Sequence, residues 1–201
     1  MTILPIVWAP DPVLKTKCLH VTSVGEAEKQ LMKDMLETMY NAPGVGLAAP
    51  QIGITKRIIV VDCARTDEPP APYKMINPEL IDTSKEEIIN EEGCLSLPGH
   101  YADVSRPSTA RVRYLDENGN QQIMDTEGLL AVCIQHEIDH INGILFVDHL
   151  SSLKRNMILK KMVKAKKERW AVKGQKSKLN YKNRSRLRLG YMGTPDFSVP
   201  A

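Results

Sequence analysis

The segment from Gln135 to His140 carries the residues best suited to chemistry in this chain, two histidines four positions apart with a glutamate beside the first. In an α-helix His136 and His140 lie one turn apart on the same face, so both imidazoles can bind one divalent metal ion. Glu137 is then placed to accept a proton from a water molecule at that ion. Residue types and spacing together indicate metal-assisted hydrolysis.

The apolar residues around this motif predict that its helix is buried. The run from Gly128 to Ile134 precedes the motif, and Ile141 and Ile144 follow it. A buried histidine is often a hydrogen-bonded core residue and not a ligand. Here two histidines and two acids would share one buried helix, and polar groups in a core need partners. A metal ion supplies a partner for both imidazoles.

A catalytic metal usually has three protein ligands, so the motif leaves one to be found. The metzincin pattern fails, because Gly143 holds its glycine position but Phe146 stands where the third histidine belongs. The thermolysin pattern needs a downstream glutamate, and the first one after His140 is Glu168. Cys94, in a tight glycine-containing segment, offers a thiolate. The sequence favours a Cys/His/His site.

A third segment, residues 44–51, reads Gly-Val-Gly-Leu-Ala-Ala-Pro-Gln. Its small residues allow close approach of the backbone to a ligand. The side-chain amide of Gln51 is a donor of the kind that stabilises a developing oxyanion. Taken alone, this segment is more typical of a packed turn than of a site.

The elements around these motifs predict an α+β fold. Helical spacing and first-turn acids predict an amphipathic helix over residues 26–41. Apolar runs and alternation predict strands at 57–62 and near 73–76, and a hairpin from 110–115 to 121–124. Strands grouped between helical regions suit antiparallel sheets better than a regular βα repeat.

A final helix is expected from Ser151 to about Trp170. Leu153, Met157, Ile158 and Met162 mark its apolar side. Its other side is rich in lysine and arginine, which is usually a solvated face but also suits contact with RNA.

Charge and hydropathy narrow the function classes. Residues 1–170 carry 20 basic against 23 acidic residues, whereas residues 171–201 carry seven basic residues and one acid, Asp196. No stretch approaches the ~20 apolar residues of a membrane span, and the first residues lack the basic and apolar regions of a secretory signal. We therefore expect a cytoplasmic protein with neither membrane nor DNA as a partner.

The three motifs, G-x-G-L-A-A-x-Q at 44–51, E-G-C-L-S at 92–96 and Q-H-E-x-x-H at 135–140, resemble in content and order those of peptide deformylases. The resemblance covers residues 1–170, including Met-Ile-Asn-Pro-Glu at 75–79. It implies one catalytic domain over 1–170, with antiparallel β-sheets around a central H-E-x-x-H helix and one helix at each end of the domain.

The resemblance implies a bacterial-type enzyme, with an activity and a cofactor. The activity is removal of the formyl group from N-formylmethionyl peptides, with release of formate. The cofactor is one divalent ion per chain, held by Cys94, His136 and His140. In such families it is usually Fe2+, with Zn2+, Ni2+ or Co2+ also accepted, and thiolate and imidazole ligands suit all of these ions.

The resemblance also assigns roles to single residues. Glu137 is the general base, and the Gln51 amide and the Leu95 backbone N–H face the charge that grows on the formyl oxygen. Glu92 and Arg106 form a supporting ion pair beside the Cys94 loop. The residues along the peptide backbone are Val45, Gly46 and Gly93, and those around the methionine side chain are Leu129, Val132 and Cys133.

Two features depart from the family pattern. Many bacterial relatives carry a basic residue at the position of Tyr101, which bears on peptide preference beyond methionine. Residues 171–201 form a basic tail that we expect to be flexible, and its end, 187–201, is similar to the start of methionyl-tRNA formyltransferases. Too few residues match for a second active site.

Two alternatives to deformylation follow from the same residues. A metallopeptidase would use the same water and glutamate on internal peptide bonds. A catalytically silent ribosome- or RNA-binding protein would keep the metal for structure alone, although such a site has no need of Glu137. In a deformylase the basic final helix offers a contact with the ribosome, from which the substrate emerges.

Overall fold

The computed structural model describes residues 2–65 and 67–169. Two compact units are present, Met1–Met162 and Val163–Ala201. In the second unit the described residues 163–169 are helical. The basic tail predicted for residues 171–201 lies outside the described residues. Among the described residues, no helix combines the length and apolar character needed to cross a membrane.

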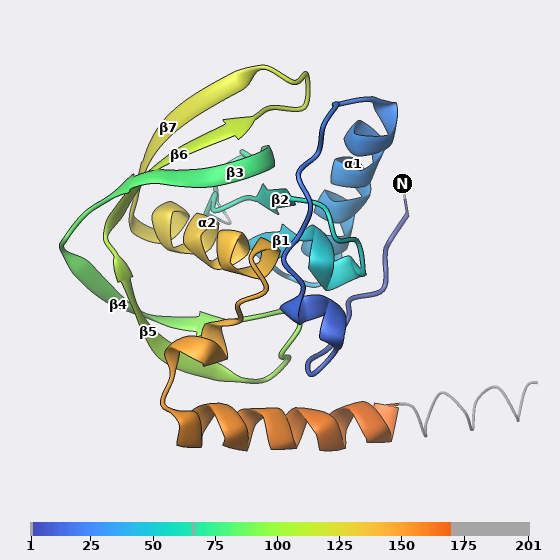
Figure 1. The fold of residues 1–201 in the computed structure, drawn as a ribbon, viewed down its shortest axis with the longest axis vertical. Coiled ribbons are helices and arrows are strands. Elements are labelled where there is room, and N and C mark those ends of the chain that lie inside the picture. Colours follow the sequence, from blue (N-terminus) through green and yellow to red (C-terminus); the bar gives the residue numbers. More distant parts are fainter. Residues whose placement is uncertain (1, 66, 170–201) are drawn as a thin grey trace, which may run out of the picture. The chain divides into compact units, whose positions relative to one another are not determined.

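The elements follow one another in the order that Figure 1 traces from blue to orange. They are η1 (Pro12–Lys15), α1 (Glu26–Asn41), β1 (Gly46–Ala48), η2 (Ala49–Ile52), β2 (Ile58–Val61), β3 (Tyr73–Thr83), β4 (Glu87–Gly93), β5 (Tyr101–Pro107), β6 (Thr109–Leu115), β7 (Gln121–Glu127), α2 (Gly128–Ile141) and η3 (Phe146–His149). A further helix covers residues 152–169. The predicted first helix and the hairpin of β6 and β7 are confirmed.

The strands form two antiparallel sheets. Five of them pair in the order β1-β2-β3-β6-β7, and β4 and β5 form a separate two-stranded sheet. In Figure 1, α2 lies between the larger sheet and the two-stranded one. The expected α+β class and the central motif helix are confirmed. The pair β4–β5 was not predicted from the sequence.

Two apolar clusters hold the larger sheet between the helices. On one side the Met-rich face of α1 packs on β1, β2 and β3, with Met35 and Met39 fully buried. On the other side Ile134, Ile138 and Ile141 of α2 pack on β2, β3 and β6. Alternating residues of β2 serve the two clusters, Ile58 and Val60 toward α1 and Ile59 and Val61 toward α2. This strand therefore fixes α2 relative to β1.

A third cluster gathers segments that are distant in sequence. Leu14 near the N-terminus, Leu97 after the Cys94 turn, Val104 of β5, Phe146 of η3 and Met162 are all buried in it. The turn that carries Cys94 is thus held from several sides.

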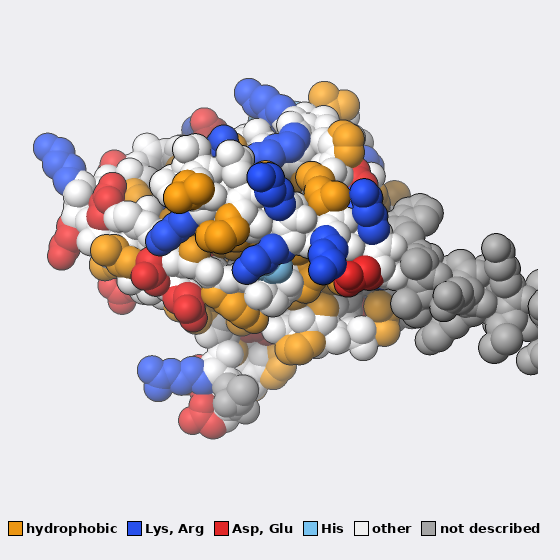
Figure 2. Space-filling model, turned by 90° about the horizontal axis from the view of Figure 1, so that it is seen from below, with side chains coloured by type: hydrophobic (Ala, Val, Ile, Leu, Met, Phe, Trp, Pro, Cys, Tyr) orange, Lys and Arg blue, Asp and Glu red, His pale blue; other side chains and the backbone are white. Residues whose placement is uncertain are grey.

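The exposed face of the final helix differs from the expectation. Met162 is buried and Ile158 partly buried, as predicted. Leu153 and Met157 are instead 78% and 50% exposed, so the expected apolar side is only partly covered. Figure 2, viewed from the side of this helix, shows lysine and arginine side chains among hydrophobic ones.

Gly143 lies two residues beyond the end of α2. Its backbone is left-handed, and another part of the chain lies where a side chain would be. Its φ is +78°, and a Cβ built on it would lie 2.6 Å from the carbonyl oxygen of Lys15. The next residues of the N-terminal segment bond to the same helix end, where the Cys18 amide donates to the Ile141 carbonyl at 2.8 Å. Glycine here allows the N-terminal segment to pack on α2.

We expect Gly143→Ala to lower the free energy of unfolding by about 3 kcal/mol, since both backbone strain and a backbone clash oppose it. Gly119→Ala is the matched control, because Gly119 has a φ of +82° but a Cβ there would meet only Val24, at 3.6 Å. The control should cost about 1 kcal/mol. Urea unfolding of metal-loaded protein measures both. Equal losses in the two variants would contradict the close approach at Lys15.

Candidate metal centre

Both motif histidines are carried by α2, as the sequence predicts. The helix begins at Gly128, whose φ of +57° turns the chain out of β7. From Ala131 to Ile138 every residue of the helix is buried. His136 and His140 are 8% and 1% exposed. Their rings meet edge to face, with centroids 5.0 Å apart.

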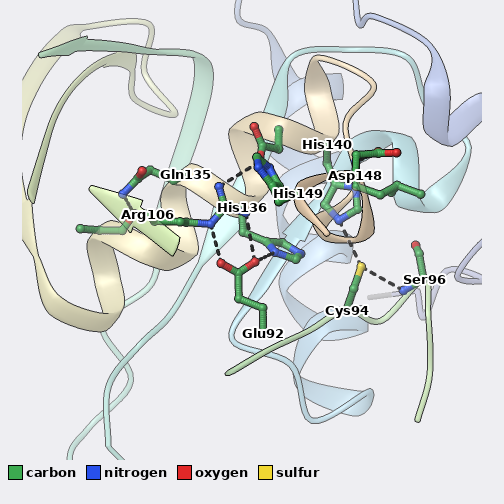
Figure 3. Close-up of polar contacts among 12 residues, drawn as sticks. Glu92, Cys94, Ser96, Arg106, Gln135, His136, His140, Asp148 and His149 are labelled. Carbon is green, nitrogen blue, oxygen red and sulfur yellow. Dashed lines mark hydrogen bonds and ion pairs between the residues drawn. The ribbon is translucent and has the colours of Figure 1, made fainter. Parts of the chain in front are cut away.

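Cys94 completes the predicted set of three ligands. It follows β4 directly, and its sulfur lies 3.1 Å from Nε2 of His140. The ligand atoms of Cys94, His136 and His140 all lie within 4.8 Å of one another. In the described part of the chain they are the one such group of three or more metal-binding side chains. Figure 3 shows the Cys94 sulfur pointing at His140.

The donor set fits a divalent metal ion. Bonds from zinc to sulfur and nitrogen are about 2.0–2.3 Å, so atoms this close to one another can share one ion. Nδ1 of His136 is bonded to Glu92, which leaves its Nε2 as the ring nitrogen for a metal. A thiolate and two imidazoles also make a ligand set typical of catalytic sites with three protein ligands.

Glu92 and Arg106 form the predicted supporting ion pair. Arg106 donates to both carboxylate oxygens of Glu92, with 3.0 Å for the Nη2–Oε2 contact, and both side chains are 5% exposed. Oε2 of Glu92 also lies 2.8 Å from Nδ1 of His136. Burial alone would raise the pKa of Glu92, but the bonds from His136 and Arg106 lower it to about 2. Glu92 is therefore an ionised acceptor that orients the His136 ring.

Gln51 reaches the same group from η2. Its Oε1 accepts the Ala48 amide at 2.8 Å, which fixes the orientation of the side chain. Its Nε2 lies 3.4 Å from the Cys94 sulfur and 3.3 Å from Oγ of Ser96. Ser96 was not singled out in the sequence. Its amide N–H also donates to the Cys94 sulfur, at 3.4 Å, as amides often do to a metal-binding thiolate.

Glu137 is buried beside these three side chains. Its side-chain atom Oε2 has no hydrogen-bond partner among the described residues. Burial raises the pKa of Glu137 to about 7. A buried carboxyl group with an unpaired oxygen is costly, and such groups gather at functional sites. The geometry therefore suits Glu137 to exchange a proton with a molecule in the site.

The backbone of Gly46 lies directly against Glu137. A Cβ on Gly46 would come within 2.4 Å of Oε1 of Glu137 and 2.8 Å of the Cys133 sulfur. The Cys133 thiol also donates to the Val45 carbonyl at 3.5 Å. The structure thus brings together the glycine-rich segment and the motif helix, which the sequence separates widely.

The other residues predicted to bind substrate differ in their exposure to solvent. Val45 and Leu129 are 46% and 57% exposed, while Val132 and Cys133 are buried. Gly93 is exposed and pairs with Tyr101 across β4 and β5. The Tyr101 ring covers the position that a side chain at Gly93 would take. A Cβ atom added to Gly93 would lie 2.5 Å from this ring. Leu95 packs on Gly44, so its half of the Cys94 turn touches the glycine-rich segment.

An α+β fold with a Cys/His/His group and a buried glutamate beside it is typical of metal-dependent hydrolases. Comparisons with known proteins narrow this class. The family model described as polypeptide deformylase matches residues 3–156. A peptide deformylase of Mesorhizobium japonicum is 50% identical over 169 residues, which are 84% of this chain and 96% of that protein. Peptide deformylase 2 of Xanthomonas campestris is 51% identical over 170 residues, 83% of this chain and 98% of that protein.

Solved structures agree with these sequence relatives. A peptide deformylase of Ehrlichia chaffeensis in complex with actinonin has a TM-score of 0.79 at 42% identity, covering 82% of this chain and 98% of that one. One from Legionella pneumophila has a TM-score of 0.77 at 43% identity, with 84% and 98% covered. The chain belongs to the peptide deformylase family. It is a metal-dependent hydrolase that removes the formyl group from N-formylmethionyl peptides and releases formate.

We expect Gly46→Ala to lower deformylation on the order of 10²-fold, because the added methyl group must displace Glu137 from the site. Metal content should not change, since the three nearest neighbours of that methyl group are atoms of Glu137 and Cys133, and neither residue is a predicted metal ligand. Gly25→Ala is the control, as its Cβ meets only Glu28, at 3.6 Å. Formate release and metal analysis provide the two measurements. A fully active Gly46→Ala enzyme would show that Glu137 need not occupy this position.

Proposed function

We propose that Cys94, His136 and His140 bind a single Fe2+ ion and that Glu137 is the general base of deformylation. The observation that carries this proposal is the unpaired Oε2 of buried Glu137, next to three side chains whose ligand atoms lie within 4.8 Å of one another. The choice of iron follows the family resemblance, and the same ligands suit Zn2+, Ni2+ and Co2+.

When bound, the metal ion supplies Lewis-acid activation of water and of the formyl oxygen. Glu137 accepts the proton of the attacking water at Oε2 and later delivers it to the leaving amine nitrogen. With its pKa raised to about 7 by burial, the carboxyl group is suited to both transfers near neutral pH. The free methionine amine and formate are the products.

Two donors serve the formyl oxygen in this proposal. The Nε2 group of Gln51 is held toward Cys94, because Oε1 of the same amide is bound by Ala48. The backbone N–H of Leu95, directly after Cys94, is the second donor. Donors fixed before the reaction stabilise the negative charge as it develops and need no rearrangement.

The peptide is proposed to lie between the unpaired edge of β1 and the start of the Cys94 turn. β1 is the edge strand of the larger sheet, Gly46 is its first residue, and Val45 directly precedes it. Gly93 faces the peptide from the other side. The buried pair Val132 and Cys133, with Leu129 at the mouth, is proposed to surround the methionine side chain.

We expect Glu137→Gln to reduce formate release from a formyl-methionyl tripeptide by about 10²–10⁴-fold, since the amide cannot accept the proton. The variant should still bind one metal ion, because the three ligands are intact. Glu127→Gln is the matched control, an exposed glutamate just before the same helix, and should have the wild-type rate. Protein is prepared anaerobically with Fe2+, and formate is measured directly.

Mass spectrometry of the same reactions separates the alternatives. Internal cleavage of unformylated peptide would favour a metallopeptidase. A folded, metal-loaded protein that releases no formate would favour the silent binding protein. A Glu137→Gln enzyme with the wild-type rate would reject Glu137 as the base.

We further propose that the final helix contacts the ribosome. Its exposed basic residues include Lys154, Lys160 and Lys161, and the exposed Leu153 and Met157 lie on the same helix. A basic face attracts the phosphates of RNA, and such attraction falls as salt concentration rises. Docking there would bring the enzyme to its substrate as the peptide emerges.

Charge reversal tests this contact. We expect Lys160→Glu with Lys161→Glu to weaken sedimentation with ribosomes at least ~10-fold at low salt, with turnover of short peptides unchanged. Lys33→Glu with Lys85→Glu makes the same change of net charge at exposed positions elsewhere. Equal losses in both double variants would indicate a nonspecific effect of net charge and contradict docking through this helix.

A further inference from the structure

A chain of hydrogen bonds continues outward from the metal ligand His136 to a residue with no assigned role, His149. His136 is bonded to Glu92, and Glu92 to Arg106. Arg106 donates from Nη1 to Oδ2 of Asp139 at 2.9 Å. His149 lies 2.7 Å from the same oxygen of Asp139 through its Nε2. Figure 3 shows members of this chain of hydrogen bonds, with His149 on the far side of Arg106 from Glu92.

Arg106 lies between two carboxylates and is the centre of this chain. Its side chain is 5% exposed, that of Glu92 is 5% exposed and that of Asp139 is 18% exposed. Oδ2 of Asp139 accepts the hydrogen bond from Arg106, and Nε2 of His149 lies 2.7 Å from the same oxygen, so this ring nitrogen is placed to donate to the carboxylate. Donors from two elements converge on one oxygen.

This convergence restricts how Asp139 can rotate. Arg106 and His149 both donate to Oδ2, so the carboxylate is held with that oxygen toward Arg106. Without His149, Asp139 would keep one of its two side-chain donors and gain freedom to turn toward solvent. Arg106 would then hold Glu92 less firmly, and Glu92 fixes the ring orientation of His136.

We propose that His149 is a positioning residue of the metal centre, which acts through Asp139, Arg106 and Glu92 on the ligand His136. The inference depends on the metal ligands proposed above. The hydrogen bond of His149 is to Asp139 and not to a proposed ligand, and its side chain is 36% exposed. It belongs to η3, whose Phe146 also stacks on the His136 ring, with centroids 6.2 Å apart.

The first test removes the hydrogen-bond donor of His149 and keeps an unbranched side chain at this position. His149→Met has no N–H to offer Asp139, whereas His149→Gln is also unbranched and has an amide donor. Substitution of a residue that supports a metal ligand typically costs about 10–100-fold in metal affinity, so for this more distant residue we expect about threefold to tenfold faster metal loss. The Met variant should show that loss to excess chelator, and the Gln variant should be close to wild type. KM for the formyl peptide should not change.

A double-mutant cycle then asks whether His149 acts through Asp139. In an Asp139→Asn background, His149→Met should have little further effect on metal release, because the carboxylate that it orients is gone. An unchanged release rate in His149→Met would overturn the inference. So would an equal effect in the Met and Gln variants, or a full effect of His149→Met in the Asp139→Asn background, since His149 would then act through the packing of η3.

The same measurement separates this inference from the proposed function. Metal loss from wild-type protein and from His136→Ala is recorded in parallel, with zinc as the probe. If His136→Ala binds zinc as tightly as wild type, the proposed ligand set is wrong. If His136→Ala loses zinc and His149→Met does not, the ligand set stands and His149 has no positioning role.

Discussion

The carboxylate of Glu92 is the constraint on which the arrangement of the site depends. It accepts hydrogen bonds from a ring nitrogen of His136 and from two nitrogens of Arg106 while almost fully buried. An unpaired charge in this place would be strongly destabilising, so the pair must form as the chain folds. Because Glu92 lies in β4, Arg106 in β5 and His136 in α2, their contact joins the two-stranded sheet to the central helix. Cys94 is two residues beyond Glu92, and its position follows from that contact.

The rest of the fold serves to keep α2 in place. One face of this helix packs on the larger sheet through isoleucines, and the motif residues lie toward the two-stranded sheet and the Cys94 turn. β1 is short, but it pairs with β2, and α2 packs on the same sheet. Gly46 can therefore lie against Glu137 with no side chain between them. The proposed role of Glu137 depends on this close approach of a strand edge to a helix.

Local patterns explain which parts of the structure could be predicted. The spacing of His136 and His140 is a property of one helix, and the first helix begins and ends where its acids and its Pro43-Gly44 predict. β4 and β5 were not predicted, because their exposed faces mix charged residues with Ile89 and Tyr101. This mixture hides the alternation of apolar and polar residues that indicates a strand. Asp139 stood inside the motif, yet its bond to His149 depends on how η3 folds back after Gly143. Contacts of that kind are decided by tertiary packing. The resemblance to a family, carried by three short motifs, supplied the roles that no local pattern could.

The separation of the two sheets has a thermodynamic consequence. β4 and β5 hydrogen-bond as strands only to each other, while their loop carries one of the proposed metal ligands and α2 carries the other two. With those ligands, a bound ion would be a cross-link between the two-stranded sheet and the central helix, closing a loop of some forty residues between Cys94 and His136. Binding to the folded form alone adds free energy that grows with the logarithm of free metal concentration. With the proposed ligands, the free metal concentration therefore sets how strongly the two-stranded sheet is held to α2.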